Sequence, residues 1–182
     1  MPYVVLGLGS NRPWQGLSCV EVLVRAVRAL RPILHDMKCS SVYETAPMYV
    51  TCQQAFCNMV VAGCVDNSMS PHDLLFRIHQ IEASLGRDRS REMRNGPRSI
   101  DIDIEVFGNE IIHFSDSKNA MNNLDIPHPR LSERAFVLLP LLEILGKSAD
   151  ILDSAPYARM LSATGSDGVV KILDADTFIK SV

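Results

Sequence analysis

Residues 94–105 read RNGPRSIDIDIE, and the alternation of isoleucine with aspartate in this stretch predicts a strand. Successive side chains of a strand point to opposite faces, so the acids Asp101, Asp103 and Glu105 share one face. The apolar side chains are expected to face the core on the other side: Ile100, Ile102, Ile104 and Val106. Asp101 and Asp103 would lie roughly 6 to 7 Å apart along the strand. At that spacing two carboxylates can share a pair of divalent cations, although an isolated DxD pattern is also typical of a solvated sheet face.

Arginines gather just ahead of this strand, with only Asp88 and Glu92 to offset their charge: Arg87, Arg89, Arg91, Arg94 and Arg98. Guanidinium groups keep their charge and bind phosphate oxygens through two hydrogen bonds at once. A charged, solvated loop would have the same composition. Beside a carboxylate pair suited to Mg²⁺, however, the arginines indicate transfer of a phosphoryl-type group from a nucleotide.

The pattern along the chain predicts an α+β fold. Strands are expected at 3–9, 39–45, 56–65 and 100–107, and helices at 20–30 and 71–85, the second with Ser70 as its N-cap and Gly86 at its end. This β-α-β-β-α-β order is typical of a ferredoxin-like, split βαβ sandwich, in which both helices pack on one face of an antiparallel sheet.

The remaining segments are expected to be additions to this sandwich. Residues 109–123 resemble a loop, 131–145 form an apolar segment interrupted at Pro140, and 150–182 hold a short helix near Tyr157 and a weak strand at 169–173. No linker divides the chain, so 1–182 are predicted to form a single domain. GLGSNR at 7–12 lacks the third glycine of a dinucleotide-binding fingerprint, and on its spacing alone we interpret it as a turn.

Composition excludes several classes of function. The 182 residues carry a net charge of -3 and have a pI near 5.9, so nothing indicates a general affinity for nucleic acid or for an acidic membrane. No apolar run approaches the ~18 residues of a membrane span, and the N-terminus lacks the basic start of a signal peptide. The five cysteines form no CxxC pair. We therefore expect a cytoplasmic protein with free thiols. We also expect it to be a monomer that acts on small molecules.

Four ordered motifs carry a resemblance to a known family: GLGSN at 7–11, YETAP at 43–47, RNGPRSIDIDI at 94–104 and PHPRLSERAFVLLPL at 127–141. Together they resemble the 6-hydroxymethyl-7,8-dihydropterin pyrophosphokinases of folate biosynthesis. The resemblance implies a ferredoxin-like fold, ATP as co-substrate and two Mg²⁺ ions. It also implies transfer of pyrophosphate from ATP to the hydroxymethyl group of the pterin, with release of AMP.

The resemblance assigns roles to residues at matching positions. Asp101 and Asp103 would hold both metal ions, and Arg87 and Arg98 would join them as catalytic residues. Arg87 and Arg89 would contact the triphosphate from a mobile loop. The ATP-binding residues would be His79, Glu82, Arg89, Ile104, His128 and Arg134. The pterin-binding residues would be Thr45, Ala46, Met48, Phe56, Asn58, Asn95 and Phe136, with Phe56 and Phe136 as aromatic faces on either side of the ring.

The chain departs from the family pattern at a few positions. Glu105 stands where the signature has an aliphatic residue, and we expect it at a solvated edge rather than as a third acid of the metal face. Asn95 replaces a tryptophan found in some members, and Ser132 a frequent histidine. Two other classes of protein stay open: another metal-dependent nucleotidyl or glycosyl transferase that shares a DxD, and a ferredoxin-like binding module without catalysis.

Overall fold

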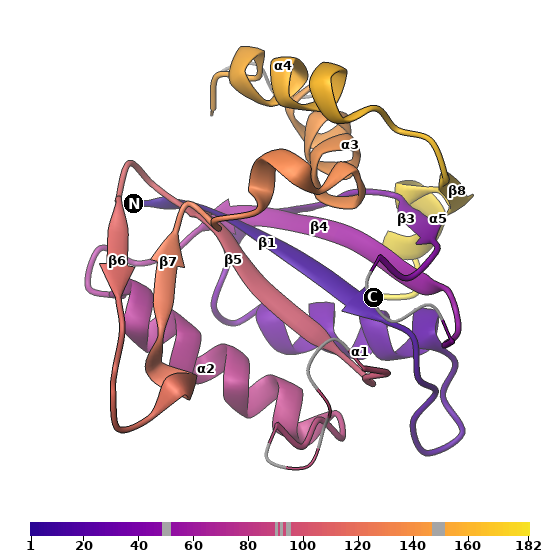
Figure 1. Cartoon of the computed structure of the whole chain (residues 1–182), viewed down its shortest axis with the longest axis horizontal. Helices are drawn as coiled ribbons and strands as arrows, with labels where there is room; N and C mark the ends of the chain where they lie inside the picture. The colour runs from indigo at the N-terminus through magenta and orange to yellow at the C-terminus, as the bar shows by residue number, and fades with distance from the viewer. Residues whose placement is uncertain (49–51, 90, 92, 94–95, 147–151) are drawn as a thin grey trace.

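The computed structural model describes the chain except for residues 49–51, 90, 92, 94–95 and 147–151 (Figure 1). Within the described residues, a six-stranded antiparallel sheet has the order β5-β1-β4-β3-β8, and β2 also pairs with β4. Its strands are β1 Tyr3–Ser10, β2 His35–Cys39, β3 Val42–Thr45, β4 Phe56–Cys64, β5 Asp101–Phe107 and β8 Val169–Leu173. The predicted α+β fold with an antiparallel sheet is confirmed.

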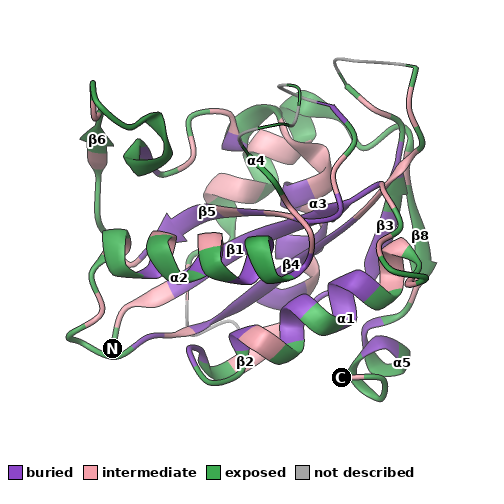
Figure 2. Ribbon diagram, turned by 90° about the horizontal axis from the view of Figure 1, so that it is seen from below, coloured by how far each residue is buried: buried purple, intermediate pink, exposed green. Residues whose placement is uncertain are grey.

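Helices cover both faces of the sheet (Figure 1). Helices α1 (Cys19–Leu30) and α2 (Pro71–Ser84) pack on one face, as predicted, around a core that includes Leu6, Met59 and Ile102. Helix α3 (Ala135–Leu145) packs on the opposite face over a second core, and α4 (Ala155–Thr164) lies against α3. Figure 2 shows the central strands largely buried and the outer sides of the helices exposed. The additions beyond the split βαβ unit therefore build a second layer.

Local signals place the first two helices. Ser18 and Ser70 each accept a hydrogen bond from the backbone three residues on, and the acids there, Glu21 and Asp73, bond back to the cap. These capping boxes satisfy N–H groups that have no partner inside the helix. The predicted end of α2 at Gly86 is confirmed, because this residue has φ +84°, which favours glycine.

The predicted strand at 39–45 is divided into β2 and β3 at two buried serines. The Ser40 hydroxyl accepts a hydrogen bond from the Val60 backbone N–H at 2.9 Å and donates one to the Ser41 carbonyl at 2.7 Å. A side chain thus takes a position in the ladder that a backbone carbonyl would otherwise occupy.

A bulge in β5 overturns the prediction that Val106 faces the same core as the isoleucines. Leu6 of β1 pairs with Ile104 while Val5 pairs with Val106, so Glu105 is the extra residue. One extra residue reverses the alternation of faces beyond it. Val106 therefore packs in the core under α3, and Phe107 takes its place in the other core.

Two segments between β5 and α4 are more regular than expected. Residues 109–123 contain strand β6 (Ile112–Phe114), which pairs with β7 (Leu124–Ile126), and a 3-10 turn, η1 (Ala120–Asn122). After a second 3-10 turn, η2 (Leu131–Glu133), helix α3 runs through Pro140 without interruption. Burial of the surrounding leucines compensates for the backbone hydrogen bond that proline cannot donate.

The C-terminal segment belongs to the sheet and its core. Strand β8 matches the predicted 169–173 and pairs with β3, covering the edge of the sheet. Helix α5 (Ala175–Ile179) follows, and its Phe178 is fully buried among residues of the first core. Five residues are too few for a helical period to be recognised in the sequence. None of the described helices is long and apolar enough to cross a membrane.

Candidate active site

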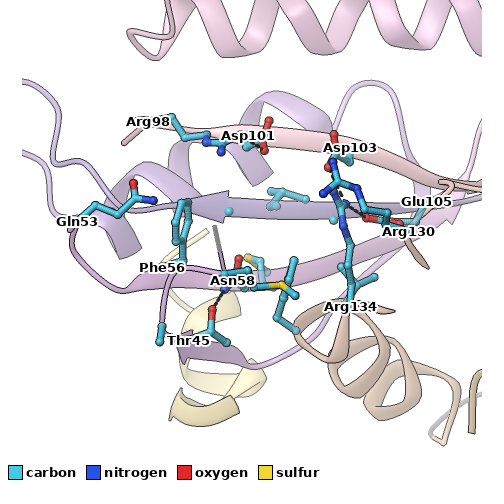
Figure 3. A pocket seen from close by; sticks show the side chains of 18 residues that line it. Thr45, Gln53, Phe56, Asn58, Arg98, Asp101, Asp103, Glu105, Arg130 and Arg134 are labelled. Carbon is cyan, nitrogen blue, oxygen red and sulfur yellow. Dashed lines mark hydrogen bonds and ion pairs between the residues drawn. The ribbon is translucent and has the colours of Figure 1, made fainter. Parts of the chain in front are cut away.

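A first pocket lies on the α3 face of the sheet, between the ends of β3, β4 and β5 and the first turn of α3 (Figure 3). Six of the seven residues predicted to contact the pterin line it: Thr45, Ala46, Met48, Phe56, Asn58 and Phe136. Asn95 lies outside the described residues. The first pocket therefore gathers residues from four segments that are far apart in the sequence, within 7–9, 45–59, 98–105 and 130–137.

Two glycines of β1 form the floor of this pocket. A Cβ atom on Gly9 would lie 3.0 Å from Asn58 Oδ1, and one on Gly7 would lie 2.9 Å from Glu105 Oε1. The strand predicted at 3–9 contains both glycines and is confirmed, whereas the interpretation of GLGSNR as a turn was wrong for residues 7–10, because β1 continues to Ser10. Their two-residue spacing within an apolar run was the available signal, since it places both glycines on one face of a strand.

Hydrogen bonds and cations shape the walls of the pocket. The buried Asn58 side chain donates from Nδ2 to Thr45 Oγ1 at 2.7 Å, which fixes the orientation of its amide. The guanidinium of Arg98 lies 5.7 Å from the centre of the Phe56 ring, and that of Arg134 lies at the same distance from Phe136. Each ring thus presents an apolar surface beside a positive charge.

Sequence reasoning missed several residues at the entrance of the first pocket. Gln53 and Arg130 line it, and Asn11 braces the loops around it. The Asn11 side chain donates to Gln53 Oε1 at 3.0 Å and accepts from the Arg98 backbone N–H at 2.9 Å. Asn11 lies in the GLGSN motif, but only the folded chain places that motif beside the other two residues.

The predicted metal ligands are paired with predicted catalytic and ATP-binding arginines. Arg98 Nη1 donates to Asp101 Oδ2 at 2.6 Å, and Arg87 Nη1 donates to the other oxygen of Asp101. Arg134 Nη1 donates to Asp103 Oδ2 at 2.8 Å. Burial by itself would raise the pKa of Asp101, but Arg87 and Arg98 together lower it below its usual value. Asp101 is therefore held as a carboxylate, and the side chains of Asp101 and Asp103 are both partly exposed, so a competing cation can reach them.

Glu82 of α2 is the buried anchor of two of these arginines. Its Oε2 accepts from Arg89 Nε and Nη2 at 2.9 and 2.7 Å, and its Oε1 accepts from Arg87 Nη1 at 3.1 Å and the Ile102 N–H at 2.9 Å. Burial raises the pKa of Glu82 to about 7, while Arg87 and Arg89 oppose the rise. Glu82 and Arg87 line neither pocket, so this predicted ATP-binding residue and this predicted catalytic residue lie behind the cavity surface.

A second pocket lies between α2, β5 and the segment from η1 to Pro129. Four of the six predicted ATP-binding residues line it: His79, Arg89, Ile104 and His128. Arg134 instead lines the first pocket. Asp103 lines both pockets, so its carboxylate stands at their junction. Apolar residues that the sequence did not single out complete the second pocket, among them Leu75, Met121 and Leu124.

Both histidines of the second pocket are kept neutral. Burial, with help from Arg89 and Arg87, lowers the pKa of His79 to about 4. Burial also lowers the pKa of His128. The Nδ1 atom of His128 accepts a hydrogen bond from the Arg130 backbone N–H at 3.1 Å, so the neutral ring carries its proton on Nε2. That nitrogen lies 4.0 Å from Asp103 Oδ2 and can donate toward an anion at the junction.

The expectation that Glu105 lies at a solvated edge is wrong. Its side chain is fully buried, and Oε1 accepts from Arg134 Nη1 at 3.0 Å. The Oε2 atom has no hydrogen-bond partner among the described residues. Burial, followed by repulsion from Asp103, raises the pKa of Glu105 to about 8, although Arg134 opposes the rise. The bulge and α3 together enclose this carboxyl, which the strand pattern alone could not predict.

The carboxylates of Asp101 and Asp103 suit a hard divalent cation that takes most of its ligands from the substrate and from water. Among the described residues, no group of three or more histidine, cysteine, aspartate or glutamate side chains converges to hold a metal. Asp101 and Asp103 would therefore supply the protein's share. Mg²⁺ is commonly bound in this way, through one or two carboxylates together with substrate phosphates and water. The residues present thus fit Mg²⁺.

Comparison with known proteins identifies the family. The family model described as 7,8-dihydro-6-hydroxymethylpterin-pyrophosphokinase (HPPK) matches residues 5–146. This chain belongs to the HPPK family. The 2-amino-4-hydroxy-6-hydroxymethyldihydropteridine pyrophosphokinase of Bacillus subtilis is 45% identical over 107 residues, covering 59% of this chain and 58% of that protein. The mitochondrial folate synthesis bifunctional protein of Pisum sativum is 35% identical over 171 residues, covering 93% of this chain and 30% of that protein.

Solved structures of HPPK proteins share the fold. A crystal structure of wild-type Plasmodium falciparum HPPK-DHPS with STZ-DHP superposes with a TM-score of 0.62 at 16% identity, covering 94% of this chain and 46% of that one. At that identity the similarity concerns the fold alone. This HPPK chain spans less than two thirds of the length of each of these relatives.

Proposed function

We propose that this chain transfers the pyrophosphoryl group of ATP to the hydroxymethyl oxygen of 6-hydroxymethyl-7,8-dihydropterin, releasing AMP, as a step of folate biosynthesis. The observation that carries the proposal is the junction at Asp103. The pocket lined by the predicted pterin contacts and the pocket lined by most of the predicted ATP contacts meet at this carboxylate. A transfer reaction requires two substrates with their reacting ends at one point.

The first pocket suits the pterin. Phe56 and Phe136 offer apolar ring surfaces, and the amide of Asn58 lies at the pocket's polar side next to Thr45. The bare backbone at Gly7 and Gly9 leaves room for a flat ring against the sheet. A pterin bound there would direct its hydroxymethyl group toward the acids of β5.

The second pocket suits ATP. Leu75, Ile104 and Leu124 offer an apolar surface for the base, and Arg89 lines the same pocket. Phosphates directed toward Asp103 would approach the arginines held by Glu82 and Asp101. Arginine pairs with phosphate through parallel hydrogen bonds and neutralises charge that develops during transfer.

Ion pairs join the acids of the site to its arginines. Among the described residues these are Glu82, Asp101, Asp103 and Glu105 with Arg87, Arg89, Arg98 and Arg134. The charges of two Mg²⁺ ions and of a fully ionised ATP cancel. Binding can therefore exchange partners, with aspartates turning to metal and arginines to phosphate, without adding net charge to a partly buried site.

Asp101 and Asp103 would hold two Mg²⁺ ions, which when bound supply positive charge to the phosphate oxygens and help to orient them. The hydroxymethyl oxygen forms a bond to the β-phosphorus of ATP, and its proton is released to the solvent. The bond from that phosphorus to the oxygen shared with the α-phosphate breaks, and AMP leaves with the electron pair. Arg98 and Arg87, which both donate to Asp101, would balance the negative charge that forms on the phosphate oxygens during transfer.

Incubation of the purified chain with ATP, Mg²⁺ and the reduced pterin alcohol tests this function, with AMP detected by chromatography and the pterin omitted as the control. AMP that appears only with pterin supports the proposal. ADP or free pyrophosphate would instead favour another metal-dependent transferase. Nucleotide binding that requires Mg²⁺ but yields no AMP would favour a binding module.

We also propose that residues 1–182 act as one domain and as a cytoplasmic monomer. The sheet supports a single domain, because β8 and α5 pack with β3 and with the first core. Sedimentation equilibrium should give the mass of one chain, 20.2 kDa. A mass of twice that value would contradict the monomer.

A further inference from the structure

Glu143, in the last turns of α3, binds two residues at the start of β3. Its Oε2 accepts from the Ser41 backbone N–H at 3.0 Å and from the Tyr43 hydroxyl at 2.9 Å. Its Oε1 accepts from the Ser41 hydroxyl at 2.7 Å. Ser41 and Tyr43 are almost completely buried, so these bonds are partly shielded from water. One carboxylate thus joins α3 to β3, although neither the metal nor the phosphate chemistry uses it.

The C-terminal segment joins the same cluster. The Ser41 hydroxyl oxygen accepts a hydrogen bond from the Ala175 backbone N–H at the start of α5, at 3.1 Å. Lys171 of β8 places its Nζ atom 3.8 Å from Glu143 Oε1 and 5.8 Å from the centre of the Tyr43 ring. Residues near the end of the chain therefore help to hold the strand that leads to the first pocket.

The cluster lies directly behind that pocket. Phe136 and Glu143 are seven residues apart, about two turns of helix, so they share one side of α3. Tyr43 and Thr45 are two residues apart and share one face of β3. Phe136 and Thr45 line the first pocket, whereas Glu143 and Tyr43 are hydrogen-bonded to each other. Helix α3 and strand β3 thus line the pocket at one end and are joined at the other end by the hydrogen bonds of Glu143 to Ser41 and Tyr43, here called the carboxylate clamp.

We infer that Glu143 is a positioning residue for the pterin substrate: by fixing α3 against β3, it sets the distance across the first pocket between Phe136 and Thr45. The inference rests on the proposed function. The second pocket is lined by residues of α2, β5 and the η1 to Pro129 segment, which the clamp does not touch. Loss of the clamp should therefore weaken pterin binding and leave nucleotide binding unchanged.

The variant Glu143→Gln tests this inference, because its amide keeps the size of the carboxyl but cannot accept on both sides. Fluorescence titration with 6-hydroxymethylpterin should give an affinity about tenfold weaker than that of the unaltered chain, the effect expected for losing a charge-assisted hydrogen bond. The milder Tyr43→Phe, which removes a single hydroxyl, should weaken pterin binding about threefold. The affinity for a non-hydrolysable ATP analogue with Mg²⁺ should be the same in all three proteins.

Val22→Ala, in the α1 core on the opposite face of the sheet, is the matched control for lost stability. It should lower the urea midpoint and leave pterin affinity intact. Unchanged pterin affinity in both Glu143→Gln and Tyr43→Phe would overturn the inference, as would an equal loss of affinity for the ATP analogue. If Glu143→Gln does not fold, Tyr43→Phe decides the matter alone. Failure of the unaltered chain to bind the pterin would instead contradict the proposed function.

Discussion

Replacing Glu105 by glutamine is expected to make the protein's stability less dependent on pH. Glu105 is fully buried, and burial with repulsion from Asp103 raises its pKa from the usual 4.5 to about 8. A carboxyl with a raised pKa in the folded state contributes stability that is complete below pH 4.5 and is lost as the pH rises through 8. Glutamine cannot ionise, so the variant does not lose that contribution.

The size of the effect follows from the same two values. At about 1.4 kcal/mol for each pH unit, the difference between 4.5 and about 8 sets an upper limit of about 5 kcal/mol. Arg134 is not left without a partner, because Asp103 still accepts from it at 2.8 Å. The new amide group is buried and costs about 1 to 3 kcal/mol at every pH. That cost cancels when two pH values are compared, so the advantage of the variant should grow by about 3 kcal/mol between pH 5 and pH 8.

Urea unfolding of both proteins at pH 5, 6, 7 and 8 in the absence of Mg²⁺ measures this difference. Glu133→Gln, at an exposed position of η2, serves as the control for removal of a carboxyl without burial. The free energy of unfolding of Glu105→Gln relative to the unaltered chain should rise steadily with pH. A relative stability that stays constant from pH 5 to pH 8 would refute the reasoning and show that Glu105 is ionised throughout.

Three further substitutions test the site and the fold. Asp103→Ala should lower the rate of AMP formation by about three orders of magnitude, while the urea midpoint stays near that of the unaltered chain because the side chain is partly exposed. Retained turnover would count against a role of Asp103 in binding the metal. Gly9→Ala places a Cβ atom 3.0 Å from Asn58 Oδ1 and should raise the KM for the pterin about tenfold, while the KM for ATP stays unchanged. An unaltered pterin KM would mean that the ring binds elsewhere. Phe178→Ala should lower the free energy of unfolding by about 3 to 5 kcal/mol in urea titrations, since the ring is fully buried. A loss below about 1 kcal/mol would mean that α5 does not contribute to the core.

Much of the fold was predictable because its signals are local. The capping serines Ser18 and Ser70 act on backbone three residues away, and the strand at 169–173 follows from its own run of β-branched residues. Helix α3 was harder to predict, because Pro140 lowers local helix propensity and only packing against the sheet outweighs it. The site residues were nominated by motif, and their gathering into the two pockets could be seen only once the chain was folded.

By itself, the sequence determined the β-α-β-β-α-β order of the central unit, the acidic face of β5 and the membership of the HPPK family, because each depends on neighbouring residues or on motifs of fixed spacing. Only the tertiary structure decided that Glu105 is buried, that Asp103 stands between two pockets, and that Glu143 holds Ser41 across 102 positions of sequence. The physical reason is that the burial and charge of a side chain depend on which distant segments fold against it. No local pattern records that neighbourhood.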